Sequence, residues 1–316
     1  MRSTQRPRRN CAAPCQPSAY GDLGSARRQP VRERAQTSDR MSEMRVIGID
    51  LAWGEGSGQR LANETGVVAV DPTGTIVAAG WTCGLDETAD WIKQFAAPDT
   101  FLAVDAPLVV SNVAKQRLCE KEVGQRYGRW KVSANSTNLN SKRLAGVELL
   151  RLLELSGWRY HDGCDGLPPT CGLHLAEVYP YTALVGAQEF GYDVERPVYK
   201  RRPKSIPLTD FRVLRPAKCD DLVRRLTGLR DADPPLDLMS HPVTRALANE
   251  ESPLGDRPYK HREDLIDAVL CAWTGLLWLK YGLERCQILG IGDSETPVAT
   301  IIAPARPEQR RSGAGA

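Results

Sequence analysis

The sequence predicts an α/β fold in which a mixed five-stranded sheet is flanked by helices, with an insertion before the last helix. Two observations lead to this prediction. Three strand-like segments follow one another between residues 46 and 81, and the later apolar segments alternate with helical ones. A three-strand meander followed by alternating strands and helices is typical of a mixed sheet with helices against its faces.

Four apolar segments supply the five strands. VIGIDLAW (46–53) is a short apolar run, as expected of a buried strand, and TFLAVDAPL (100–108) is another. TGVVAVDPTGTIVAAGW (65–81) contains two strands joined by DPTG, which has Pro and Gly where a hairpin turn requires them. LAEVYP (175–180) is the last strand and ends at a proline.

Four further segments are expected to be helical. LDETADWIKQFA (85–96) is amphipathic, and SKRLAGVELLRLLELSG (141–157) ends at a glycine that would stop a helix. CDDLVRRLTGL (219–229) lies within the Pro-rich, charged insertion at about residues 186–258. HREDLIDAVLCAWTGLLW (261–278) reads as one long last helix.

The ends of the chain differ from this middle part. Residues 1–43 are rich in Arg, Pro, Gln, Ser and Ala without apolar periodicity, so we expect a disordered basic extension. Such an Arg-rich, acid-poor segment also fits an organellar transit peptide. A mis-assigned start is the simpler explanation, because Met41 and Met44 directly precede the first strand. The tail at 303–316 is likewise expected to be disordered, which leaves one folded domain at 44–302.

Bulk composition narrows the class of protein. The chain has 316 residues, 41% hydrophobic and 26% charged, which is ordinary for a globular protein. Its net charge of +3 is too small to indicate an anionic partner by itself. No run approaches the roughly 18 apolar residues of a membrane span, so no membrane partner is expected. The nine cysteines form no CxxC pair, which favours reduced thiols in the cytoplasm over a disulfide framework.

Three predicted strands each carry one carboxylate within or at the end of an apolar run. These residues are Asp50 in IGIDLAW, Asp105 in LAVDAPL and Glu177 in LAEVYP. One such acid usually caps a turn, but three of them suggest a shared purpose. In open α/β sheets, ligands bind at the carboxyl ends of parallel strands. If the first and fourth strands are neighbours, Asp50 and Asp105 lie side by side.

The last helix adds two acids, Asp264 and Asp267, among apolar residues. At about 100° per residue they share one face with Ala268, Cys271 and Gly275, whose small side chains let another element approach closely. An acid in the first turn complements the helix dipole, which explains Asp264 as well as a functional role does. Asp267 lies deeper, and it needs a partner because burying an isolated charge is costly.

A divalent cation is the partner that these acids suit best. Carboxylates that lie close together cannot all stay ionised unless one takes a proton or a cation joins them. Clusters of Asp and Glu oxygens are the ligands that Mg²⁺ and Mn²⁺ prefer. The sequence therefore predicts a metal site at Asp50, Asp105 and Asp267.

Five motifs resemble those of a known family. They are VIGIDLAWGEG, FLAVDAPL, RLCEKEVGQRYG, LAEVYPYTAL and HREDLIDAVLCAW, which together span about residues 45–280. On these motifs the chain resembles the ribonuclease H-like superfamily, and more closely the DUF429 family of predicted nucleases of that fold. HREDLIDAVLCAW is also similar to the closing helix of Holliday-junction resolvases, in which two acids three residues apart bind metal.

This resemblance implies a metal-dependent nuclease with a ribonuclease H-like domain. Asp50, Asp105, Glu177 and Asp267 are then the catalytic acids, and Asp264 joins Asp50, Asp105 and Asp267 as a metal ligand. Two Mg²⁺ or Mn²⁺ ions are expected, with water attacking a phosphodiester in line. No nucleophilic side chain is required, and the sequence contains no GxSxG motif.

Two basic segments are candidates for contacts with nucleic acid, whether DNA or RNA. The first follows the Asp105 strand and would hold phosphates; it comprises Lys115, Arg117, Arg126, Arg129 and Lys131. The second, YKRRPKS (199–205), places an aromatic residue beside basic ones, a combination that suits single-stranded nucleic acid; its basic members include Lys200, Arg201 and Arg202. A solvated loop explains the second segment equally well.

A structural zinc site in HDGCDGLPPTCGLH (161–174) is a lesser alternative. His161, Cys164, Cys171 and His174 are four ligands of the types that bind structural Zn²⁺, although their spacing matches no known pattern.

Two other function classes remain open. An actin-like or sugar-kinase-like phosphotransferase shares such a sheet but normally needs two domains and glycine-rich phosphate loops. DLAWGEGSG lacks the GK[ST] ending of a P-loop. A non-catalytic module that binds nucleic acid is the third class, and the survival of Asp50, Asp105 and Asp267 together weighs against it.

Overall fold

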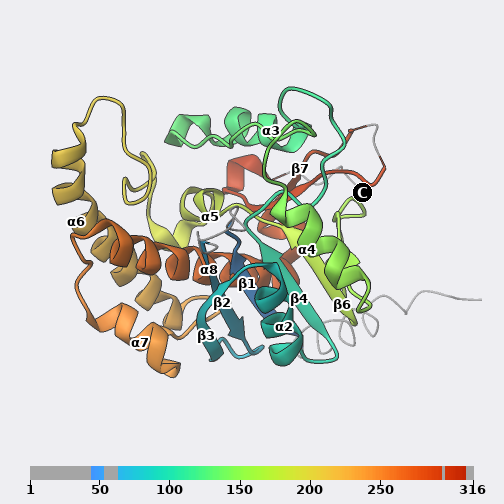
Figure 1. Ribbon diagram of the computed structural model, residues 1–316, viewed down its shortest axis with the longest axis horizontal. Helices are drawn as coiled ribbons and strands as arrows, with labels where there is room; N and C mark the ends of the chain where they lie inside the picture. Colours follow the sequence, from blue (N-terminus) through green and yellow to red (C-terminus); the bar gives the residue numbers. More distant parts are fainter. Residues whose placement is uncertain (1–43, 53–62, 294–295, 311–316) are drawn as a thin grey trace, which may run out of the picture.

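A six-stranded mixed sheet forms the centre of the protein, with helices against both faces (Figure 1). The structure is a computed structural model that describes residues 44–52, 63–293 and 296–310. The predicted extension at 1–43 lies outside the described residues. The sheet has the strand order β3-β2-β1-β4-β6-β5, so the α/β class and the mixed sheet are confirmed.

The sheet contains one strand more than the five expected. The added strand is a two-residue edge strand that pairs in parallel with β6. The strands are β1 (Arg45–Asp50), β2 (Glu64–Val70), β3 (Ile76–Cys83), β4 (Thr100–Val104), β5 (Arg159–Tyr160) and β6 (Leu173–Glu177).

The first three strands form the expected antiparallel meander. The turn between β2 and β3 is fixed by Asp71, whose Oδ1 accepts hydrogen bonds from the backbone amides of Thr73 and Thr75. Gly74 closes this turn with φ of 86°, a conformation that a glycine adopts without strain. Strand β4 then pairs in parallel with β1, and β6 pairs in parallel with β4.

Helices cover the two faces unequally. Helices α2 and α4 lie on one face, and the long helix α8 crosses the other (Figure 1). The predicted helix at 141–157 is shorter in the structure, and the one at 219–229 is longer. The helices are α2 (Leu85–Phe95), α3 (Leu118–Tyr127), α4 (Ala145–Glu154), α5 (Pro180–Gly186), α6 (Leu208–Thr227), α7 (Pro242–Asn249) and α8 (Asp256–Tyr281).

Helix α8 lies unusually close to the sheet. A Cβ added to Gly48 on β1 would collide with the backbone of Ala268, and one added to Gly66 on β2 would collide with the backbone of Asp264. These two glycines therefore permit the close approach. By length and composition α8 could also span a membrane, but 89% of its most apolar window is buried inside the protein, as expected of a core helix.

The end of the folded part corrects one prediction. Residues 303–310, expected to be disordered, are placed in the structure, because β8 (Ile301–Pro304) pairs with β7 (Cys286–Leu289) in an antiparallel hairpin. Beyond it, Arg306 is 7% exposed and donates from Nε to the carbonyl oxygen of Val185. An apolar strand and a buried arginine thus hold this segment against the domain.

Candidate metal centre

Asp50 and Asp105 leave the sheet side by side on the face that α8 covers. Side chains alternate along a strand, and Gly48 faces α8, so Asp50 two residues later faces it as well. The same parity applies to Ala103, which lies near Gly275 of α8, and to Asp105. The two carboxylates therefore point toward the same helix.

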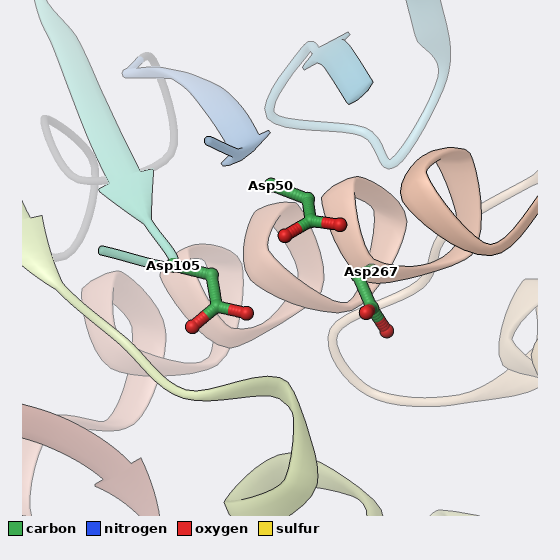
Figure 2. Close-up of side chains that lie close together, drawn as sticks. All are labelled: Asp50, Asp105 and Asp267. Carbon is green, nitrogen blue, oxygen red and sulfur yellow. The ribbon is translucent and has the colours of Figure 1, made fainter. Parts of the chain in front are cut away.

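Helix α8 supplies the third carboxylate, that of Asp267. One oxygen from each of Asp50, Asp105 and Asp267 lies within 4.8 Å of the others. Figure 2 shows the three carboxylates extending from two strand ends and the helix into a common space. Asp267 is fully buried and Asp50 is 9% exposed. The structure thus brings together three of the four expected metal ligands.

The three carboxylates of this cluster repel one another. Among the described residues, the buried Oδ2 of Asp50 finds no hydrogen-bond partner. Burial raises the pKa of Asp105 well above its ordinary value, and the carboxylates of Asp50 and Asp267 raise it further against the opposing effect of Lys200. Burial raises the pKa of Asp267 as well. A cation that joined these acids would relieve this repulsion.

Lys200 lies inside the cluster, where the sequence did not place it. Its ammonium group forms an ion pair with Oδ2 of Asp267 and lies 4.0 Å from Oδ2 of Asp105. The neighbouring Tyr199 donates a 2.6 Å hydrogen bond from its hydroxyl to Oδ1 of Asp267. Burial opposes the charge on Lys200, but Asp267, Asp50 and Asp105 together raise its pKa. Lys200 was expected to contact nucleic acid; in the structure it forms ion pairs with the acids, and its contact with nucleic acid stays a prediction.

Asp264, the fourth expected ligand, lies beside Asp50 rather than within the group of three. Its carboxylate forms an ion pair with Lys260, one turn earlier in α8, which also contacts Glu263. Burial and the Asp50 carboxylate raise the pKa of Asp264 to about 8, although Lys260 opposes the shift. Asp264 therefore lies at the edge of the cluster, paired with Lys260.

Glu177 does not join the three aspartates of the metal cluster, and its role as a catalytic acid stays a prediction. The residue pairs in register with Val104, and Val104 points away from the α8 face because Asp105, its neighbour, points toward that face. Glu177 instead accepts hydrogen bonds of 2.8 and 2.7 Å from the two terminal nitrogens of Arg117. Parity along the strand therefore separates Glu177 from Asp50 and Asp105.

Arg117 was expected to hold phosphates, but it is 3% exposed. Its guanidinium also donates to Glu120 at 2.9 Å and to the carbonyl oxygen of Val109 at 3.0 Å. Glu177 in turn accepts a hydrogen bond from the backbone amide of Leu108. The buried pair of Arg117 and Glu177 thus fixes the segment that leaves β4 directly after Asp105.

The remaining basic residues of the first segment are engaged within the protein. Arg126 donates to Gln287, Arg129 pairs with Glu308 while lying 3.7 Å above the ring of Trp130, and Lys131 pairs with Glu195. Lys115 adopts φ of 68°, and its carbonyl oxygen accepts hydrogen bonds from Asn112 and Asn138. Arg129 and Lys131 are nevertheless exposed, so contacts between this segment and phosphate stay a prediction.

A cavity of about 750 Å³ opens in front of the acids. Asp50, Asp105 and Asp264 line it, together with Lys200 and Arg201. Sequence reasoning missed several of its other lining residues, which are Asn63, Asn135, Tyr179, Tyr181, Arg257 and Lys260. For Arg257 and Lys260 a signal was present, since they lie three residues apart at the start of the helix that carries the acids. Arg202 points elsewhere and donates to the carbonyl oxygen of Ile206.

The lesser alternative, a zinc site, is not formed. Nε2 of His161 accepts a 3.2 Å hydrogen bond from the indole of Trp278, and Nε2 of His174 bonds to the carbonyl oxygen of Cys171. Cys164 and Cys171 are free and exposed. Within the part of the chain that the structure describes, the three aspartates are the only group of acids, histidines or cysteines that gathers around a common point.

Comparisons of the chain with known proteins found no match. No protein-family model matches the chain, and neither the curated proteins nor the solved structures contain a match to it. The function must therefore be argued from the side chains of the site.

Proposed function

We propose that this protein is a metal-dependent nuclease of the ribonuclease H-like fold, which hydrolyses phosphodiester bonds of DNA or RNA. One observation carries the proposal. Asp50, Asp105 and Asp267, which are far apart in the sequence, place carboxylate oxygens within 4.8 Å of one another, and one buried oxygen of Asp50 has no partner among the described residues.

The charges of the site suit a divalent cation. The carboxyl groups of Asp50, Asp105, Asp264 and Asp267 face the ammonium groups of Lys200 and Lys260. Asp50, Asp105 and Asp267 would hold Mg²⁺ or Mn²⁺, because both ions prefer carboxylate oxygens. Such an ion supplies a Lewis acid that lowers the pKa of water and neutralises charge on a phosphate in the transition state.

The topology supports the fold named in the proposal. Strands β1, β2 and β3 form a meander, and β4 and β6 follow in parallel beside β1. The resemblance to ribonuclease H-like proteins implies the same sequence of pairings. It also implies a last helix with two acids three residues apart, which is how α8 presents Asp264 and Asp267.

The cavity suits an anionic polymer better than a small apolar ligand. Arg201, Arg257 and Lys260 lie along its wall beside the acids, and such residues neutralise phosphates. Tyr179 and Tyr181 also line it, and aromatic rings provide surfaces on which unpaired bases stack. A segment of single-stranded nucleic acid therefore suits both the acids of the cavity and the basic and aromatic residues that line it.

The reaction would need no nucleophilic side chain. Water attacks the phosphorus, the bond to the leaving oxygen breaks, and the proton of the water passes to solvent. Cys83 is the one thiol among the described residues that line the cavity. Burial and the carboxylates of Glu87 and Glu64 raise its pKa, which keeps it protonated and a poor nucleophile.

The proposal is tested by incubating the purified full chain with branched, single-stranded and RNA–DNA hybrid substrates in Mg²⁺ or Mn²⁺. We expect cleavage of at least one substrate, loss of cleavage in EDTA, and a decrease of about a thousandfold in Asp50→Asn. Asp90→Asn is the matched control, because Asp90 lies on α2 with a side chain that is 80% exposed.

Three outcomes would contradict the proposal. Cleavage that survives in Asp50→Asn would remove the cluster from the reaction. Hydrolysis of nucleoside triphosphates with every polymer intact would favour a phosphotransferase. Binding of nucleic acid without turnover in either metal would favour a non-catalytic module.

A further inference from the structure

We propose that Lys200 fills one of the two cation positions expected in this site, so that the protein binds one divalent ion between Asp50 and Asp105. This inference rests on the proposed function and concerns how the chain itself completes the metal centre. A protein ammonium group would then act where a second ion was expected.

The hydrogen bonds divide the four acids into two pairs. Both oxygens of Asp267 are engaged, one by the hydroxyl of Tyr199 and the other by Lys200. Asp264 is engaged by Lys260. The two acids of α8 thus each have a lysine of their own.

The two acids at the strand ends lack such partners. Within the described residues, Oδ2 of Asp50 has no hydrogen-bond partner, and the nearest cation to the Asp105 carboxylate is Lys200 at 4.0 Å. An ion held by Asp50 and Asp105 would therefore displace no existing bond. An ion held by Asp267 and Asp105 would have to displace Lys200.

The fold holds Lys200 in place through its neighbour in the chain. Tyr199 is fully buried, and its carbonyl oxygen accepts a 2.6 Å hydrogen bond from the hydroxyl of Tyr259 on α8. The Tyr199 ring also packs edge-to-face against Tyr181 at 5.9 Å between centroids. With this anchor beside it, the Lys200 side chain is only 23% exposed. Lys200 is therefore positioned by the core and is not a mobile surface lysine.

The ion pairs of the two lysines favour one ion over two. The carboxylates of Asp50, Asp105, Glu263, Asp264 and Asp267 share this region with Lys200 and Lys260. With all five acids ionised, one divalent ion would leave a net charge of about −1 and two ions a net charge of about +1, so net charge alone does not decide the number of ions. One ion between Asp50 and Asp105 keeps both lysines where the structure places them, whereas a second ion at Asp267 would displace Lys200.

The inference also assigns a use to the segment YKRRPKS. Its first two residues build the site: Tyr199 orients Asp267, and Lys200 completes the positive charge beside Asp105. Arg201 continues along the wall of the cavity. The segment YKRRPKS therefore belongs to the metal centre, and Arg201 extends it along the wall of the cavity.

The test is the number and affinity of Mn²⁺ ions bound per chain, measured by equilibrium dialysis without substrate. We expect one ion for the wild type and for Lys200→Arg, which keeps the positive charge. Lys200→Met should bind two ions, or bind the first at least tenfold more tightly. Lys93→Met, on the exposed face of α2, is the matched control and should behave as the wild type.

The outcomes separate this inference from the proposed function. Two ions bound by the wild type would overturn the inference and leave the nuclease proposal standing. Equal binding by Lys200→Met and the wild type would also overturn it. Binding of no Mn²⁺ by the wild type would overturn the proposed function itself. If Lys200→Met fails to fold, the stoichiometries of the wild type and Lys200→Arg still decide.

Discussion

Asp50 and Asp105 leave two neighbouring parallel strands at the same level, because the backbone amide of Asp105 donates a 2.8 Å hydrogen bond to the carbonyl oxygen of Ile49. Sheet hydrogen bonds therefore force the two carboxylates together whether or not a cation is present. Such preorganisation favours binding of an ion and destabilises the protein without one.

Asp50→Asn should stabilise the protein when divalent ions are absent. The substitution removes a charge from the cluster, and the new amide group can donate to the neighbouring carboxylates. We expect the free energy of unfolding in EDTA to rise by about 1 kcal/mol, which corresponds to a Tm increase of about 2–4 °C. Thermal melts with and without Mn²⁺ measure both effects, since Mn²⁺ should raise the Tm of the wild type but not of the variant. If the variant were less stable than the wild type in EDTA, repulsion between Asp50 and the neighbouring carboxylates would not destabilise the protein.

Gly48→Ala should disturb the site by displacing α8 from the sheet. The added methyl group would collide with the backbone of Ala268 and push α8, which carries Asp267, away from β1. We expect a loss of about 3 kcal/mol in the free energy of unfolding and weaker Mn²⁺ binding. Gly80→Ala on β3 is the control, because a Cβ there meets no atom within 4 Å. Equal stabilities of the two variants in urea denaturation would show that α8 does not depend on this contact.

Much of the fold could be predicted because its signals are local. Short apolar runs, the DPTG turn and the long apolar helix each specify an element without reference to the rest of the chain. The tail after residue 303 could not be predicted in this way. Its strand β8 is short and owes its place to pairing with β7.

The composition of the site could not be predicted from local sequence signals alone. Asp50, Asp105 and Glu177 have the same appearance in the sequence, as single acids that end apolar strands. Only the register between β4 and β6 shows that Glu177 faces the other way and pairs with Arg117. The ion pairs between Lys200 and the acids were missed for a related reason. The segment of Lys200 is polar, and only the burial of Tyr199 brings it to the acids.

Arg117→Met tests whether the buried pair with Glu177 supports the Asp105 segment. The change leaves Glu177 and Glu120 buried without their cation, so we expect a loss of about 3–5 kcal/mol in the free energy of unfolding. Adding Glu177→Leu should recover part of this loss, because it removes one of the stranded charges. Arg129→Met, which breaks an exposed pair with Glu308, should cost less than about 1 kcal/mol. Urea denaturation distinguishes these values, and a cost for Arg117→Met as small as the control would exclude the supporting role.

The raised pKa of Asp264 sets the direction of the last expected effect. In the folded protein this carboxyl keeps its proton up to about pH 8, because burial and the Asp50 carboxylate outweigh Lys260. In the unfolded chain it loses the proton near pH 4. Between these values the folded state binds more protons than the unfolded state, so the free energy of unfolding must fall as pH rises.

We therefore expect the protein in EDTA to lose stability from pH 5 to pH 8, by at most about 1.4 kcal/mol per pH unit for one such proton. Asp264→Asn should flatten this slope, while Asp90→Asn should leave it unchanged. Saturating Mn²⁺ should oppose the fall, because a cation favours the ionised carboxylates around Asp50. Urea denaturation at half-unit steps of pH measures the slope. A stability that rises with pH in EDTA, or an equal slope in Asp264→Asn, would show that this carboxyl is not crowded by Asp50.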